Sequence, residues 1–112
     1  MKNTSKLVYG VGINDLNTTV TANGVHLLFY RCWMHMLARC YSIKYQNERP
    51  TYAGCIVCEE WKLLSNFKKW YDDNYNEGFH LDKDILVEGN KIYSPDTCCF
   101  VPQYINSILT DR

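Results

Sequence analysis

The sequence lacks an excess of charge of either sign. Twelve Lys and Arg residues balance twelve Asp and Glu residues, so the formal net charge is zero. The chain therefore has neither the global positive field typical of proteins that bind nucleic acid nonspecifically nor the acidic excess of a DNA mimic. Any binding of nucleic acid has to depend on a local cluster of basic side chains.

Long apolar runs, internal repeats and low-complexity tracts are also missing. No segment approaches the ~18 apolar residues that a membrane-spanning helix needs, and the opening MKNTSKLVYGVG contains no apolar stretch of signal-peptide length. We therefore expect a cytoplasmic protein without a membrane partner. At 112 residues the chain is long enough for one modest core and too short for two, which excludes a large multidomain enzyme.

Aromatic residues are what the sequence has in abundance: nine Tyr, four Phe and three Trp. Such side chains provide a short chain with much buried area, and surplus Tyr and Trp suit a binding surface. Six cysteines are also present. Because no secretion signal is visible, we interpret them as reduced thiols rather than as three disulfides.

Three regions can be distinguished within one predicted domain that spans residues 1–112. Residues 1–25 are loop-like and rich in Gly, Asn and Thr. Residues 26–78 hold two predicted helices, at 26–41 and 59–71, whose apolar residues recur at three- and four-residue spacing. The polar run at 45–50 is predicted to be an exit loop, because the first helix must stop before Pro50.

The pattern in residues 79–112 predicts a strand, a turn, a second strand and a helix. The strands are expected at 79–86 and 98–101 with a turn at 88–91. Ser94 and Pro95 suit the cap and first turn of a very short helix, and Pro102 opens the final helix. The predicted fold class is therefore α+β, a small helical domain with a short β-hairpin.

Cysteines and acidic residues each form a candidate metal site. Cys55 and Cys58 have the spacing that lets two thiolates bind one zinc ion, with His80 and one of the adjacent Cys98 and Cys99 as further ligands. We favour the simpler interpretation that the cysteines fill core positions, and we expect no structural zinc.

The acidic cluster lies at the end of the first predicted strand, in the run Asp82-Lys83-Asp84. Paired carboxylates there can hold a divalent cation, since Mg²⁺ takes oxygen ligands and keeps waters for chemistry. A salt-bridged strand end would produce the same short pattern. The spacing alone does not decide between these two interpretations.

Three segments together resemble phage proteins of the HNH homing-endonuclease group, which have the ββα-metal type of site. They are YRCWMHMLARCY at 30–41, VCEEWKLLSNFKKW at 57–70 and LDKDILVEGNKIYSPDTCCFVPQYIN at 81–106. The opening YGVGIND at 9–15 also fits, so the resemblance covers nearly the whole chain. Larger relatives carry a further DNA-binding domain after this region, and we expect this chain to lack it.

The resemblance implies roles for individual residues. Asp82 matches the metal-binding Asp and Asn106 the last metal ligand, for Mg²⁺ or Mn²⁺. Lys83 occupies the place of the general-base His, and a protonated lysine is a poor base. His80 or Asp84 would replace it, because positions two residues from Asp82 share its face of a strand. Thr97 falls where the family has its loop Asn.

These observations predict a DNA-binding phage protein of HNH ancestry that acts in the infected host cell and that is, if active, a weak metal-dependent nicking endonuclease. Double-stranded DNA would meet basic and aromatic side chains on and around the two helices: Arg31, Arg39, Lys44, Lys68, Lys69 and Trp70. The resemblance assigns Trp33, Trp61 and Phe67 to the core. The alternative is a catalytically inactive protein that binds and modulates a host protein through its aromatic surface.

Overall fold

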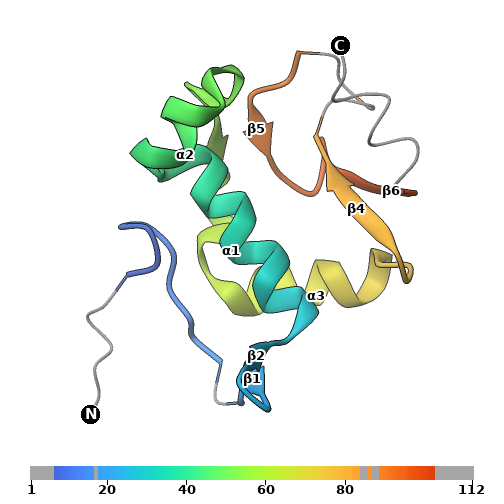
Figure 1. Cartoon of the computed structure of the whole chain (residues 1–112). Helices are drawn as coiled ribbons and strands as arrows, with labels where there is room; N and C mark the ends of the chain where they lie inside the picture. Colours follow the sequence, from blue (N-terminus) through green and yellow to red (C-terminus); the bar gives the residue numbers. More distant parts are fainter. Residues whose placement is uncertain (1–6, 17, 84–85, 87–88, 103–112) are drawn as a thin grey trace.

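The computed structural model describes residues 7–16, 18–83, 86 and 89–102. Within them, helices and short strands combine into an α+β arrangement, as predicted (Figure 1). In chain order the elements are β1 (Thr21–Ala22), β2 (Val25–His26), α1 (Leu28–Tyr41), α2 (Ile43–Glu48), the 3₁₀ turn η1 (Pro50–Tyr52), β3 (Ile56–Val57), the 3₁₀ turn η2 (Glu60–Lys62), α3 (Leu64–Asn74), β4 (Phe79–Asp82), β5 (Ile92–Tyr93) and β6 (Cys99–Pro102).

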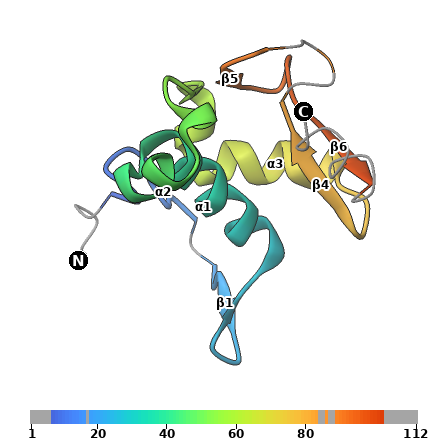
Figure 2. The same ribbon diagram turned by 45° about the horizontal axis from the view of Figure 1, so that its top comes forward.

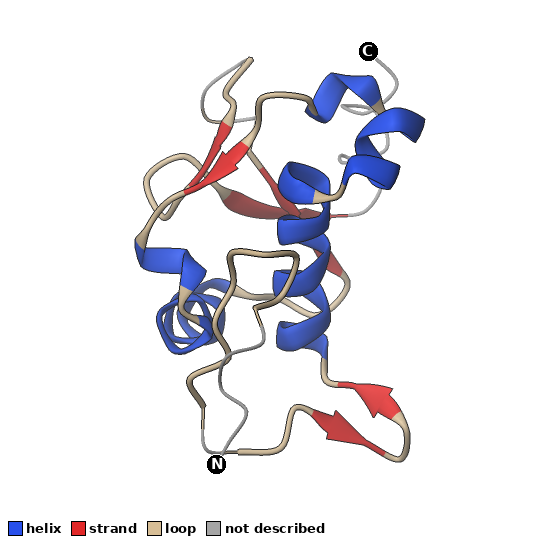
Figure 3. Cartoon of the chain, turned by 90° about the vertical axis from the view of Figure 1, so that its left-hand side faces the viewer, coloured by secondary structure: helices blue, strands red, loops and turns tan. Residues whose placement is uncertain are grey.

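The region predicted as loop before the first helix contains a small hairpin instead. Strands β1 and β2 pair antiparallel, and the turn between them uses Asn23 and Gly24, both with positive φ (53° and 78°). Asn and Gly tolerate this left-handed conformation, which matches the twist of a two-residue hairpin. The hairpin projects from the N-terminal end of α1 (Figures 2 and 3), so the helix begins at Leu28 rather than at His26.

Helix α1 buries the face that the sequence periodicity predicts. Its core-facing side chains include Phe29, Trp33, Met36 and Leu37. The prediction of a plain exit loop at 45–50 is wrong, because most of that run lies in α2. Ser42 ends α1 in an extended conformation, and its side chain then accepts a hydrogen bond from the Tyr45 amide, which caps the new helix.

The second predicted helix is interrupted at Leu63, which separates η2 from α3. The N-terminal segment causes the break: the Ile13 amide donates to the Lys62 carbonyl (2.8 Å), and the Leu64 amide donates to the Ile13 carbonyl (2.9 Å). Asp15 then caps α3, since its carboxylate accepts from the Ser65 amide at 2.8 Å. Hydrogen bonds to a distant segment therefore replace those of a continuous helix.

The two strands predicted near the end of the chain pair as expected, but they begin and end at different residues. Strand β4 ends at Asp82 and pairs antiparallel with β6, with Leu81 opposite Phe100. Between them, β5 pairs in parallel with β3, which the sequence pattern did not predict. Ser94 begins a hydrogen-bonded turn to Cys98 and no short helix. The expected final helix after Pro102 lies outside the described residues.

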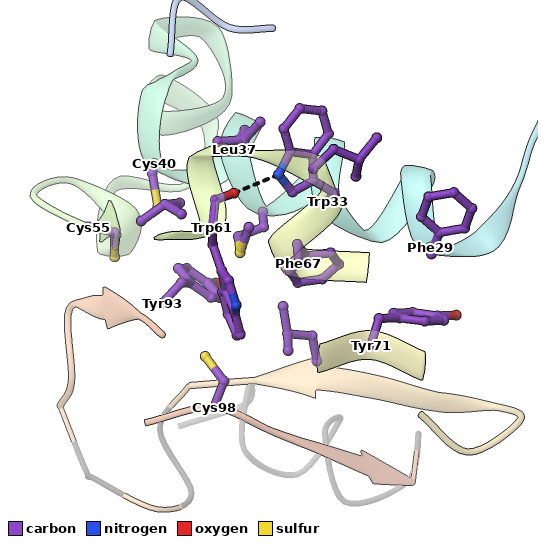
Figure 4. Close-up of a cluster of buried hydrophobic side chains, with 14 residues drawn as sticks. Phe29, Trp33, Leu37, Cys40, Cys55, Trp61, Phe67, Tyr71, Tyr93 and Cys98 are labelled. Carbon is purple, nitrogen blue, oxygen red and sulfur yellow. Dashed lines mark hydrogen bonds between the residues drawn. The ribbon is translucent and has the colours of Figure 1, made fainter. Parts of the chain in front are cut away.

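The core forms where α1, η2, α3 and β5 meet, around aromatic rings (Figure 4). Trp33, Trp61 and Phe67 are completely buried, as predicted, and the Trp33 indole donates to the Trp61 carbonyl at 2.8 Å. Three of the six cysteines also occupy core positions: Cys40, Cys55 and Cys98. None of the described helices has the length and apolar character that crossing a bilayer requires.

Candidate functional site

A groove runs between α1, the end of α3 and the β4–β6 pair, and it encloses a cavity of about 230 Å³. One side carries four basic side chains, which define the basic side of what we call the α1 groove: Arg31, His35, Arg39 and His80. The first three lie at four-residue spacing, so they form one stripe on α1 beside its core-facing side chains. His80 comes from β4, so a strand end faces the helix stripe.

The α1 groove also has aromatic lining residues, which we call the aromatic wall. The aromatic wall consists of Tyr71, Tyr75, Phe79 and Phe100. The Tyr71 and Tyr75 rings stack at 4.6 Å, and Phe100 meets Tyr75 edge-on at 5.3 Å. These mutual contacts hold the rings in defined orientations before any ligand arrives.

The remaining lining of the groove is apolar or neutral: Leu28, Cys32 and Leu81. Burial raises the pKa of the Cys32 thiol to about 12, against a smaller opposing effect of Arg39. Cys32 is therefore a protonated thiol at neutral pH, and it supplies neither a nucleophile nor a metal ligand in that state.

The electrostatics of the groove are one-sided. None of its described lining residues is acidic, and the ion pairs between described residues, Lys62 with Glu59 and Lys68 with Asp72, lie elsewhere. Burial lowers the pKa of His35 from 6.5, and the charges of Arg39 and Arg31 lower it further. Burial and the two arginines thus both favour the neutral form of His35, and an anion in the groove would favour its protonation.

Arg39 occupies an unusual position within this stripe. Its guanidinium carbon lies 5.8 Å from the centroid of the Tyr52 ring. Its Nε–H is buried and finds no hydrogen-bond partner among the described residues. The rest of the Arg39 side chain has partners inside the protein, because it forms hydrogen bonds with the Tyr45 and Tyr93 side chains.

The predicted catalytic residues differ in how exposed they are. His80 is exposed and lines the α1 groove, whereas Asp82 is only 7% exposed and lies opposite Cys99 in the strand pair. Lys83 is also 7% exposed, and its Nζ lies 5.9 Å from the Tyr52 ring centroid. Lys83 is therefore packed against an aromatic ring, and Asp84 lies outside the described residues.

The described residues do not by themselves form a metal site. They contain no group of three or more His, Cys, Asp or Glu side chains that could hold an ion, and the second predicted ligand, Asn106, lies outside them. Asp82 as a whole is 7% exposed, and its role as a ligand of Mg²⁺ or Mn²⁺ stays a prediction.

The two cysteines of the CxxC pair lie in different environments. Cys55 is buried beside Cys40 in the core (Figure 4), and its side chain, together with burial, raises the pKa of the Cys40 thiol. Cys58 is only half-buried. None of the six cysteines forms a disulfide bond, and the absence of a structural zinc stays a prediction.

The predicted DNA-binding residues divide into three groups. Arg31 and Arg39 line the α1 groove. Three lysines lie outside its lining: Lys44 and Lys69, which are exposed on α2 and α3, and Lys68, which forms an ion pair with Asp72 at 2.7 Å. Trp70 stacks on Phe100 at 5.2 Å and also contacts Trp61. Trp70 is thus half-buried against the core rings, and its role in DNA binding stays a prediction.

Sequence reasoning missed two parts of the groove. His35 could have been found, because its spacing from Arg31 and Arg39 places all three on one stripe of a helix. Tyr75 and Phe100 gave no such signal. They meet only because the end of α3 packs against the β4–β6 pair.

No family model, curated protein or solved structure matches this chain. The resemblance to the HNH group therefore stays a prediction. The α1 groove is the part of the structure that bears on function, and its basic and aromatic residues are all described.

Proposed function

We propose that this protein binds DNA and that the α1 groove is where it contacts the phosphate backbone. The observation that carries the proposal is the convergence of Arg31, His35, Arg39 and His80 on one groove without an acidic lining residue. Arginine forms strong, directional hydrogen bonds with phosphate oxygens. Such contacts position a protein on DNA without reading its sequence.

The zero net charge limits this binding to a local interaction. A protein whose charge is balanced overall does not attract DNA from a distance, so the affinity depends on the groove alone. If Arg31 and Arg39 each neutralise one phosphate, the logarithm of the affinity falls with the logarithm of salt concentration with a slope of about −2. We therefore expect moderate binding that is lost steadily as salt is added.

The groove supports the DNA-binding part of the predicted HNH ancestry, because its described residues supply cations for phosphate. Two residues of the predicted catalytic site, Asp84 and Asn106, lie outside the described residues. Incubation of the protein with supercoiled plasmid and Mg²⁺ or Mn²⁺ tests the nicking activity. Nicking that is abolished by Asp82→Ala and by Asn106→Ala would show a nuclease, and no nicking with either metal would leave DNA binding alone.

The binding proposal is tested with two matched charge variants. Arg31→Gln removes one positive charge from the groove, and Lys69→Gln removes one from the exposed surface of α3. Both side chains are exposed, so neither substitution should disturb the core. Fluorescence anisotropy with a labelled duplex should show that Arg31→Gln weakens binding and makes the salt slope about one unit shallower. Lys69→Gln should leave the slope unchanged.

Two results would overturn the proposal. Equal effects of Arg31→Gln and Lys69→Gln on DNA affinity would mean that DNA responds to the overall charge of the protein and not to the α1 groove. Failure of the intact protein to bind any DNA at low salt would remove the proposal altogether and would favour the alternative that the chain binds a host protein.

A further inference from the structure

The α1 groove has an aromatic wall, and a DNA duplex bound through its phosphate backbone would not contact this wall with its bases. This inference rests on the proposed function and names the form of DNA that fits both walls. We propose that the groove holds one unpaired nucleotide of a DNA strand, with its flanking phosphates on Arg31 and Arg39 and its base against the aromatic wall. The preferred ligand is thus single-stranded DNA rather than an intact duplex.

The size of the groove favours a single nucleotide. Its cavity is about 230 Å³, which is below the usual range for drug-sized ligands. A duplex keeps its bases stacked and paired inside the helix, so its outer surface presents phosphates and sugars to such a groove. Only a nucleotide that has left the stack can bring a base to an aromatic ring.

The arrangement of the two arginines agrees with a strand that passes along the groove. They lie eight residues apart on α1, so their Cα atoms are about 12 Å apart along the helix axis. The long side chains of Arg31 and Arg39 can converge on the two phosphates on either side of one nucleotide, with His35 between them. Both arginines line the groove, so phosphate oxygens in it would meet their guanidinium groups.

The aromatic wall is organised to receive a base. Tyr75 is half-buried, its ring is parallel to that of Tyr71 within 12°, and its hydroxyl accepts a hydrogen bond from the Gly78 amide at 3.2 Å. Phe100 stands edge-on to both tyrosine rings. Rings that are already fixed lose little freedom on binding, and stacking on them is tolerant of sequence.

The first experiment uses the intact protein and needs no variant. A labelled 20-nucleotide thymidine strand and a duplex of the same length are compared by anisotropy at matched salt. Because stacking adds to the phosphate contacts, the single strand should bind about tenfold more tightly. Equal affinities, or tighter binding of the duplex, would overturn this inference while leaving the proposed DNA binding in place.

The second experiment assigns the preference to the aromatic wall. Tyr75→Leu removes the ring, whereas the matched control Tyr75→Phe keeps the ring and removes only the hydroxyl. The ratio of single-strand to duplex affinity should fall towards one in Tyr75→Leu and should be retained in Tyr75→Phe, with folding of both checked by circular dichroism. A ratio that is unchanged in a folded Tyr75→Leu protein would refute the role of the wall. If the intact protein bound neither single-stranded nor duplex DNA, the proposed function itself would be refuted.

Discussion

Among the glycines, Gly12 is the one whose backbone lies directly against core side chains, so its substitution tests the packing of the core. A Cβ built on Gly12 would lie 2.5 Å from Leu37 Cδ1 and 2.8 and 2.9 Å from two atoms of the Trp33 ring. Non-bonded carbon atoms prefer a separation of about 3.5–4.0 Å. The substitution Gly12→Ala therefore forces the backbone or both side chains to shift by roughly 1 Å.

The magnitude follows from how little these neighbours can move. Trp33 and Leu37 are 0% exposed, and a shift of the Trp33 ring also disturbs its 2.8 Å hydrogen bond to the Trp61 carbonyl. Overpacking of a well-filled core costs about 1–3 kcal/mol, and we expect the upper end. A loss of about 3 kcal/mol would lower the melting temperature of a domain of this size by roughly 12–24 °C.

Urea denaturation followed by tryptophan fluorescence measures the free energy of unfolding of Gly12→Ala. The control is Gly10→Ala in the same loop, where an added Cβ meets no atom within 4 Å and only the left-handed backbone (φ 79°) costs about 1–2 kcal/mol. Leu37→Val removes the atom nearest to the new Cβ, so it should relieve part of the loss in the double variant. The packing around Gly12 would be refuted if the Gly12→Ala variant had the same free energy of unfolding as the unmodified chain. It would also be refuted if Gly12→Ala lost less stability than Gly10→Ala.

Three further predictions concern the core, the groove and the thiols. Trp33→Phe removes the indole donor and leaves the buried Trp61 carbonyl unpaired, which should cost about 1–3 kcal/mol in urea denaturation; a loss below about 0.5 kcal/mol would contradict the hydrogen bond. The folded state lowers the pKa of His35 below 6.5, so the unfolded chain binds more protons and stability should fall as pH drops through 6.5. His35→Gln should lose less stability between pH 7.5 and 5.5, and equal losses would argue against the lowered pKa. In the native protein a thiol reagent should modify the half-exposed Cys58 and Cys99 before the buried Cys40, Cys55 and Cys98. The same modification rate for exposed and buried cysteines would contradict this burial.

Three residues of the α1 groove could be predicted as functional from the sequence. The sequence predicts Arg31 and Arg39 to bind DNA, because they lie on a helix among aromatic residues, and the family resemblance suggests His80 for catalysis. These predictions belong to two separate sites. The structure brings them into one groove, because the pairing of β4 with β6 places the exposed His80 beside the α1 stripe. No local pattern predicts which helix a strand end will face.

The outcome for Asp82 and Lys83 shows a different limit. Strand alternation predicts a shared face for His80 and Asp82 but not their exposure: His80 is exposed and Asp82 is 7% exposed. Lys83, which the resemblance puts in the place of the general base, lies against the Tyr52 ring. The burial of a polar side chain at a strand end depends on what packs against it, and for Lys83 that partner is 31 positions away in the sequence.

The sequence by itself determined the elements whose signals are local. The three- and four-residue spacing of apolar side chains specifies α1 and its buried face, and the large aromatic residues on that spacing specify the core around Trp33, Trp61 and Phe67. The tertiary structure alone decided the break at Leu63, the parallel pairing of β3 with β5 and the composition of the α1 groove. These features depend on hydrogen bonds and ring contacts between segments far apart in the chain. Periodicity reports only that a face is buried, and never which segment buries it.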